Sequence, residues 1–264
     1  MAESKNIDGR AATVLLCVIA FAAANANLAF ASACNFEAQG EGRVAAVIDA
    51  RSFRMEDGRE VHLAGIETAD AAGKADGTPA LSALVAGRGV VLRGETDAPD
   101  RYGRQPAFVF ADAGGASVQG LLLAQGEALV SGTVADMACA AELAAAETAA
   151  RRAKRGVWAD TEVIKNAESP GDILTRIGRF TVVEGKVLSV RQAGATSYIN
   201  FGRRWTQDFA VTISRRVMPT FEAVGISLKA LENKRIRVRG WVESRGGPRI
   251  DARTPGQIEL AGEN

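Results

Sequence analysis

Histidine and cysteine are scarce in this chain of 264 residues, which contains one histidine, His62, and three cysteines. Cys17 lies in an apolar N-terminal run. Neither Cys34 nor Cys139 has sequence neighbours that suggest a metal site or an activated nucleophile. The cysteines therefore give no sign of metal–thiolate or cysteine-nucleophile chemistry.

Long apolar runs are also missing after the N-terminal segment, so no later segment is expected to span a bilayer. The run at residues 11–24 is too short for a stable span. It follows two basic residues and precedes the Ala-Ser-Ala sequence at residues 31–33. This pattern is typical of a signal peptide, here residues 1–33, with cleavage before Cys34. We therefore expect a periplasmic or secreted protein.

Two fates are open to Cys34 after that cleavage. Cys34 and Cys139 would form an even pair in an oxidising compartment, where a disulfide is expected. A lipoprotein signal also ends just before a cysteine, so lipid attachment at Cys34 is the alternative. Ala31 is a poor match to the leucine usual three residues earlier, and the sequence therefore favours the disulfide.

The charge is balanced overall but unevenly distributed along the chain. Residues 35–170 contain 14 Lys and Arg against 20 Asp and Glu, whereas residues 171–264 contain 16 against 9. The split suggests two modules, and the basic one is a candidate for binding nucleic acid or another polyanion. The same asymmetry would also arise if two domains attracted each other.

The first half of the chain reads as a strand meander with helices added late. Asp57-Gly58 predicts a tight hairpin turn between two alternating stretches. The pattern predicts strands at 42–49, 51–56, 59–66, 88–93, 105–111 and 127–131, and helices at 77–86, 116–125 and 137–155. This order indicates an α+β, mainly β fold built around a small barrel.

The second half is expected to form a smaller β domain. Residues 161–178 are polar and are predicted to be a linker, and residues 179–260 the domain. Strands are predicted at 180–191, 196–201, 207–213, 234–244, 248–252 and 256–260, with a helix at 228–233. The first five of these strands, with the helix between the third and fourth, follow the order of an OB barrel.

Four segments between residues 40 and 160 together resemble one family, the staphylococcal-nuclease-like or thermonuclease domains. They are Val47–Ser52, similar to the family's V-x-D-G-D-T strand; Val61–Asp70, similar to R-L-x-G-I-D-x-P-E; Asp100–Arg104, which matches D-R/K-Y-G-R; and Glu147–Trp158, similar to the family's final helix. The resemblance implies an OB barrel with helices and phosphodiester hydrolysis.

The resemblance implies a Ca²⁺ site held mainly by two aspartates. The first falls on Arg51, a cation, and the second on Glu67, which is one methylene longer. Asp49 matches the first aspartate of the D-G-D-T motif, so Asp49 and Glu67 are the remaining candidate metal ligands. Because a guanidinium at position 51 would repel a divalent ion, we expect little or no Ca²⁺ binding. Calcium or another divalent metal is expected only if the protein is active.

The resemblance also implies three catalytic positions: a glutamate base and two arginines that stabilise phosphoryl charge. They fall on Asp70, His62 and Arg104, so only the second arginine is kept. Each residue also has a structural reading, with His62 as an ordinary strand residue and Arg104 as part of a turn. Tyr102 is interpreted as a packing residue.

The second domain offers a possible nucleic-acid surface. Arg235, Arg237 and Arg239 alternate along a predicted strand and therefore share one face. The aromatic residues expected near this face are Tyr198, Phe201 and Trp205. Cations that meet phosphates and rings that stack on bases would suit nucleic acid, and an exposed solubilising edge is the alternative.

Three functional hypotheses follow. The first is an exported, degenerate nuclease relative that binds nucleic acid or another polyanion without cleaving it. The second is an active phosphodiesterase with a rewired site that uses His62, Glu67, Asp70 and Arg104. The third is an envelope module that binds a protein, although the sequence names no such partner.

Overall fold

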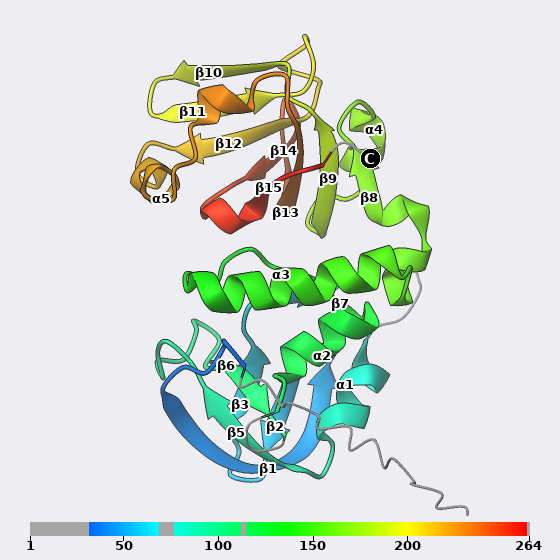
Figure 1. Cartoon of the computed structure of the whole chain (residues 1–264), viewed down its shortest axis with the longest axis vertical. Helices are drawn as coiled ribbons and strands as arrows, with labels where there is room; N and C mark the ends of the chain where they lie inside the picture. Colours follow the sequence, from blue (N-terminus) through cyan, green and yellow to red (C-terminus); the bar gives the residue numbers. More distant parts are fainter. Residues whose placement is uncertain (1–31, 69–76, 112–114, 263–264) are drawn as a thin grey trace, which may run out of the picture.

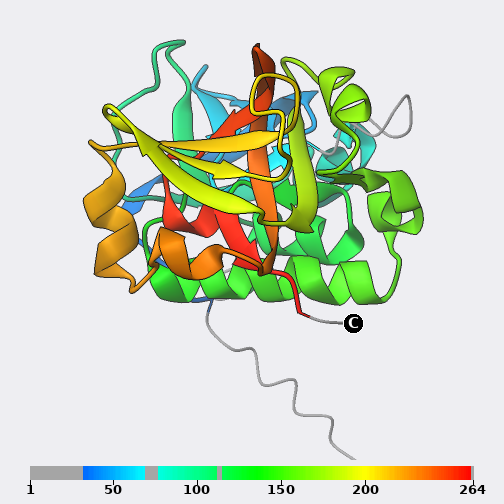
Figure 2. The ribbon, with the colours of Figure 1, turned by 90° about the horizontal axis from the view of Figure 1, so that it is seen from above.

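The computed structural model describes residues 32–68, 77–111 and 115–262 of the chain (Figure 1). Two β units are stacked along the long axis of the molecule, with helix α3 (Met137–Arg152) between them. Figure 2 looks down this axis, and the second unit overlies α3 in that view. The predicted α+β, mainly β fold class is confirmed.

The first unit is a closed five-stranded barrel. Its strands are β1 (Ala38–Asp49), β2 (Ser52–Met55), β3 (Glu60–Leu63), β5 (Gly89–Arg93) and β6 (Gln105–Phe110), in the order β1-β2-β3-β6-β5. The β3–β6 pair is parallel and the other pairs are antiparallel. Inward side chains such as Phe53, Leu63 and Leu92 are fully buried, as the alternation along each strand predicts.

Helices α1 (Thr78–Val85), α2 (Val118–Gln125) and α3 pack on this barrel, and strand β4 (Ile66–Thr68) pairs with β7 (Ala128–Val130) beside them. Ser117 caps the N-terminus of α2, where its hydroxyl accepts a hydrogen bond from the Gly120 amide. Asp136 caps α3, where its carboxylate accepts from the Cys139 amide. A 3-10 turn, η1 (Gly156–Ala159), follows α3. The predicted helices and strands of this unit are present with shifted ends, except that the strand predicted at 59–66 is divided by a turn at residues 64–65 into β3 and the start of β4.

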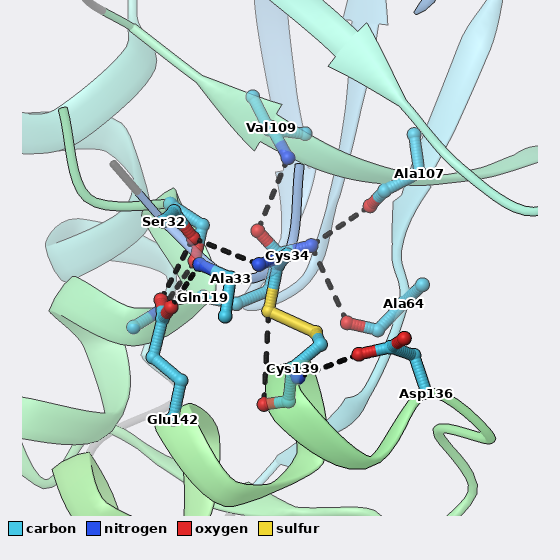
Figure 3. Close-up of a disulfide and its surroundings, with 12 residues drawn as sticks. Ser32, Ala33, Cys34, Ala64, Ala107, Val109, Gln119, Asp136, Cys139 and Glu142 are labelled. Carbon is cyan, nitrogen blue, oxygen red and sulfur yellow. Dashed lines mark hydrogen bonds between the residues drawn. A yellow bond between two sulfur atoms is a disulfide. The ribbon is translucent and has the colours of Figure 1, made fainter. Parts of the chain in front are cut away.

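A disulfide between Cys34 and Cys139 ties the chain before β1 to the first turn of α3 (Figure 3). Both cysteines are fully buried. Glu142, one turn further along α3, accepts hydrogen bonds from the Ser32 hydroxyl and the Ala33 amide. The Cys34 sulfur therefore lies in the protein interior, in a disulfide bond that closes a loop of 105 residues.

The second unit has the same strand order as the first. Its main strands are β9 (Phe180–Lys186), β10 (Ser189–Ala193), β11 (Thr196–Asn200), β12 (Ala210–Ser214), β13 (Arg235–Arg245) and β14 (Gly247–Asp251), arranged β10-β11-β12-β14-β13-β9. Val187 and Leu188 form the corner at which the chain leaves β13 and joins β11. With β9 and β10 taken as two halves of one strand, this is the order of an OB barrel.

Short elements complete the second unit. They are η2 (Thr161–Val163), β8 (Ile164–Asn166), α4 (Pro170–Leu174), α5 (Met218–Ala223), η3 (Leu228–Leu231), η4 (Pro255–Gln257) and β15 (Ile258–Leu260). Residues 161–178, expected to be a linker, instead contain β8 paired with β9 and α4, whose Ile173 is fully buried. Polar composition suggested a linker because the apolar residues of this segment that pack into the core, Val163, Ile164, Ala167 and Ile173, do not follow a regular period.

The two units meet through a buried ion network. The Arg239 guanidinium of β13 contacts both Glu147 carboxylate oxygens of α3 at 3.0 and 2.9 Å, and it donates to the Val130 carbonyl of β7 at 3.0 Å. Glu147 also accepts from the Val130 amide at 2.8 Å, and Glu259 of β15 contacts Arg239 at 3.1 Å. Trp158 and Phe180 belong to an apolar cluster at the same junction. Opposite charges therefore join the two units.

Loss of the disulfide is expected to destabilise the protein. Replacing Cys34 and Cys139 with serine releases a loop of 105 residues, and chain-entropy arguments put the cost near 4–5 kcal/mol. Urea unfolding with and without reductant measures it. Reductant is expected to destabilise the wild-type protein and to leave the double variant unchanged; equal stability of the two oxidised proteins would contradict the prediction.

Arg239→Ala is expected to cost about 3–5 kcal/mol of unfolding free energy, because it leaves Glu147 charged and buried without its partner. Arg235→Ala is the matched control, since Arg235 is on the same strand but is exposed and pairs only with Glu184. That variant is expected to cost less than about 1 kcal/mol. Similar losses in the two variants would show that the buried network contributes no special stability.

Candidate functional site

The candidate site lies where the β1–β2 turn, strand β3 and strand β4 come together on the first barrel. Arg51 is in the turn, His62 is on β3 and Glu67 is on β4. The register pairs Ser52 with His62 across the β2–β3 hairpin. Arg104 precedes β6, which pairs with β3, so the fold brings these sequence-distant side chains to one end of the barrel.

Arg51 points at the acid of β4. Its Nη1 atom lies 2.5 Å from Glu67 Oε2 and donates to the Ile66 carbonyl at 3.2 Å. Both side chains are largely buried. Burial raises the pKa of Glu67, and the facing Arg51 guanidinium opposes that rise. The guanidinium therefore fills the space in front of the surviving acid and supplies its counter-charge.

The residues present do not fit the Ca²⁺ ion that the family resemblance implies. Calcium needs several oxygen ligands around one point. Glu67 faces a cation, and Asp49 uses Oδ1 to accept from the Arg51 backbone amide at 2.9 Å. Within the described ranges, no three His, Cys, Asp or Glu side chains are grouped closely enough to hold a metal. Asp70, the expected base, lies outside the described residues.

His62 is a neutral, half-buried ring rather than a replacement for arginine. Its Nδ1 lies 3.0 Å from the hydroxyl of Ser52, which is fully buried. Burial, together with the positive charges of Arg51 and Arg104, lowers the pKa of His62 to about 4. At neutral pH the ring therefore carries no charge with which to stabilise a phosphoryl oxygen. The predicted two-residue turn at Asp57-Gly58 would have set Ser52 opposite Leu63, whereas the observed loop has three residues and its register sets Ser52 opposite His62.

Arg104 is held by its own turn. Its Nε and Nη2 atoms donate to Asp100 Oδ2 at 3.0 and 2.8 Å. Burial alone would raise the pKa of Asp100, but hydrogen bonds from the Arg104 side chain and from the Arg104 and Tyr102 amides outweigh it and lower the pKa to about 2. Asp100 is therefore ionised at neutral pH and takes part of the charge that Arg104 would offer a phosphate.

Tyr102 differs from the packing role expected for it. The ring is 68% exposed, and the guanidinium carbons of Arg101 and Arg104 lie 5.0 and 5.1 Å from its centre. These distances are within the range of cation–π contacts. The turn thus presents an exposed aromatic ring in contact with two cations at the edge of the site.

The predicted nucleic-acid face of the second barrel is not an open basic surface. Arg239 is 3% exposed and is bound to Glu147. Arg237 pairs with Glu184 and Glu259, and Arg235 pairs with Glu184. Strand alternation predicts that the three arginines share a face but not which groups meet them: acids of the same unit pair with Arg235 and Arg237, and the first unit covers Arg239. Trp205 lies on a different loop and is 77% exposed.

The sequence-based predictions did not include Glu147 as a buried ion-pair partner. It lies among buried residues of α3 at helical spacing, after Cys139 and Leu143 and before Ala150. An acid on the apolar face of an alanine-rich helix is a signal for a buried counter-charge. The sequence therefore contained this signal, although it did not identify Arg239 as the partner.

Part of the chain matches a known protein family. Residues 67–160 fit the family model described as staphylococcal nuclease homologue. The region is a staphylococcal-nuclease-like domain. The matched range of the nuclease-like domain begins at Glu67 and includes the Asp100–Arg104 turn and α3, and the predicted resemblance is confirmed. No curated protein matches the chain significantly. In the described part of the chain, no helix is long and apolar enough to cross a membrane.

Lowering the pH is expected to destabilise the first unit, because the folded protein disfavours protonation of His62. The unfolded chain binds this proton near pH 6.5 and the folded protein only near pH 4, so stability is full above pH 6.5 and falls between those values. We expect a loss of about 1–2 kcal/mol, reduced by the ring's partial contact with solvent.

Urea unfolding at several pH values tests this, with His62→Gln as the non-titrating comparison. The difference between the two proteins is expected to be largest above pH 6.5 and to shrink toward pH 4. The ionisation of Asp100 contributes only at lower pH, because its pKa is about 2. Parallel pH profiles for wild type and variant would contradict the assignment.

Proposed function

We propose that this protein is an exported, non-hydrolytic member of the nuclease family that binds nucleic acid or a similar polyanion. The nuclease-like domain supports a role in the nuclease family and in nucleic-acid binding. The disulfide between Cys34 and Cys139 is consistent with an oxidising compartment. Together they favour a periplasmic or secreted binding module.

The observation that carries the proposal is the Arg51–Glu67 ion pair. Two unit charges about 4 Å apart interact by roughly 4 kcal/mol at an effective dielectric near 20, and these groups are closer than that. A divalent ion entering beside Glu67 would have to displace the guanidinium or bear its repulsion. Without a metal ion at this position, the site lacks the group that would polarise a phosphodiester.

Binding does not need that metal. The Arg101–Tyr102–Arg104 turn offers an exposed ring and flanking cations, a combination that suits bases and phosphates. Asp100 offsets part of this charge, which favours weak, salt-sensitive binding over tight recognition. The competing hypothesis is that His62, Glu67, Asp70 and Arg104 form a rewired catalytic site that cleaves nucleic acid. A cleavage assay with several metals tests it.

The wild-type protein is expected to leave labelled DNA and RNA intact with Ca²⁺, Mg²⁺, Mn²⁺ or Zn²⁺, while still retarding them at low salt. Product analysis on denaturing gels tests cleavage, and native gels test retardation. Cleavage with any one metal that disappears in Asp70→Ala or Arg104→Ala would overturn the proposal in favour of the rewired phosphodiesterase.

Arg51→Asp is expected to gain Ca²⁺ affinity of about tenfold or more, because a repelling cation becomes an oxygen ligand beside Glu67. Isothermal titration calorimetry measures the change. Arg54→Asp is the matched control, since Arg54 is exposed on β2 and its replacement makes the same change in net charge. Equal gains in both variants would mean that surface charge, and not the position of Arg51, excludes calcium.

A further inference from the structure

The loop between β11 and β12 presents the most exposed tryptophan among the described residues. Trp205 is 77% exposed, whereas Trp158 is buried and Trp241 is 49% exposed and stacks edge-on against Phe180. A tryptophan held in water forfeits the free energy of its burial, about 1.5–3 kcal/mol for a large apolar side chain. Its position therefore needs an explanation other than packing within this chain.

The loop that carries Trp205 is ordered by its own hydrogen bonds. Asp208 Oδ2 accepts from the Arg204 amide at 2.6 Å, and the Arg204 carbonyl accepts from the amides of Gln207 and Asp208 at 2.7 and 2.8 Å. These bonds close a compact turn and leave Trp205 at its tip. The indole is therefore presented outward by a defined backbone.

Arginines lie on two loops that meet at this tip. Arg203 and Arg204 flank Trp205, and Arg245 comes from the β13–β14 hairpin. Gly246 of that hairpin has a φ of +85°, and a side chain at this position would meet the Thr206 backbone at 3.3 Å, so the two loops touch. All three arginines are exposed, and no ion pair or side-chain hydrogen bond engages them within the described part of the chain.

The acids nearby are already engaged. Asp208 accepts hydrogen bonds within its own loop, and Glu243 pairs with Arg249 at 3.3 Å. The Asp208 carboxylate offsets part of the positive charge of the three arginines, none of which has an ion-pair partner in the described part of the chain, and they lie on the same two loops as the exposed indole. We name this set, Arg203, Arg204, Trp205 and Arg245, the Trp205 surface.

We propose that the Trp205 surface binds single-stranded nucleic acid, with a base stacked on the indole and phosphates against the arginines. An isolated indole with flanking cations suits a ligand that alternates flat rings and negative charges. An anionic membrane fits less well, because insertion needs a contiguous apolar face and this tip has one apolar side chain. The surface is separate from the Arg101–Tyr102–Arg104 turn, so it does not depend on the function proposed for the first domain.

Fluorescence anisotropy with a labelled oligothymidylate tests the proposal on the full chain. Trp205→Ala is expected to weaken binding roughly tenfold or more, the usual effect of losing one stacking ring, and Trp205→Phe to retain most of it. Arg203→Ser with Arg204→Ser is expected to lower the slope of log affinity against log salt by about 1.4. Arg216→Ser, an exposed arginine elsewhere on this barrel, is the control and is expected to change affinity little.

The outcomes separate this inference from the proposed function. Loss of binding in Trp205→Ala but not in Arg101→Ser supports the Trp205 surface even if the first domain binds nothing. The reverse result, or no binding of the oligonucleotide by the wild-type protein, overturns it. Trp205-dependent binding to vesicles of anionic phospholipid without oligonucleotide binding also overturns it, in favour of a lipid headgroup ligand.

Discussion

The buried contact between Arg239 and Glu147 is the interaction on which the architecture depends. One guanidinium meets both carboxylate oxygens of α3 and the carbonyl of β7, so a single side chain of the second barrel is bound to two elements of the first. A charge buried this deeply is tolerable only with its partner in place. Part of the opposite charge of the two halves of the sequence is thus used at this junction, where an arginine of the second half meets an acid of the first.

This junction lies one strand away from the candidate site. Val130, which the network holds at both its amide and its carbonyl, pairs with Ile66 across the β4–β7 ladder. The Ile66 carbonyl in turn accepts from Arg51, which faces Glu67. The network that holds Val130 thus lies across the β4–β7 ladder from Ile66, whose carbonyl accepts from Arg51, so the junction with the second barrel and the candidate site share this two-stranded ladder.

Local patterns in the sequence predicted much of the fold. The Asp57-Gly58 turn, the alternating strands and the capped alanine-rich helix are short-range features, and the structure contains each of them. The arginine at position 51 also predicted that a positive charge would face Glu67. Burial across the domain junction could not be read in this way, because Arg239 and its partner Glu147 are 92 residues apart. The exposed Tyr102 was missed for the same reason, since sequence alone does not show which rings lack a covering neighbour.

The two barrels share one strand order, yet they are completed at different times during synthesis. Glu147 leaves the ribosome 92 residues before Arg239, and Glu259, which also contacts Arg239, comes almost at the C-terminal end. Until then α3 carries a carboxylate on its apolar face with no counter-ion from the second barrel. Folding of the first barrel alone would leave Glu147 without this counter-charge, so its stability depends on the presence of the second barrel.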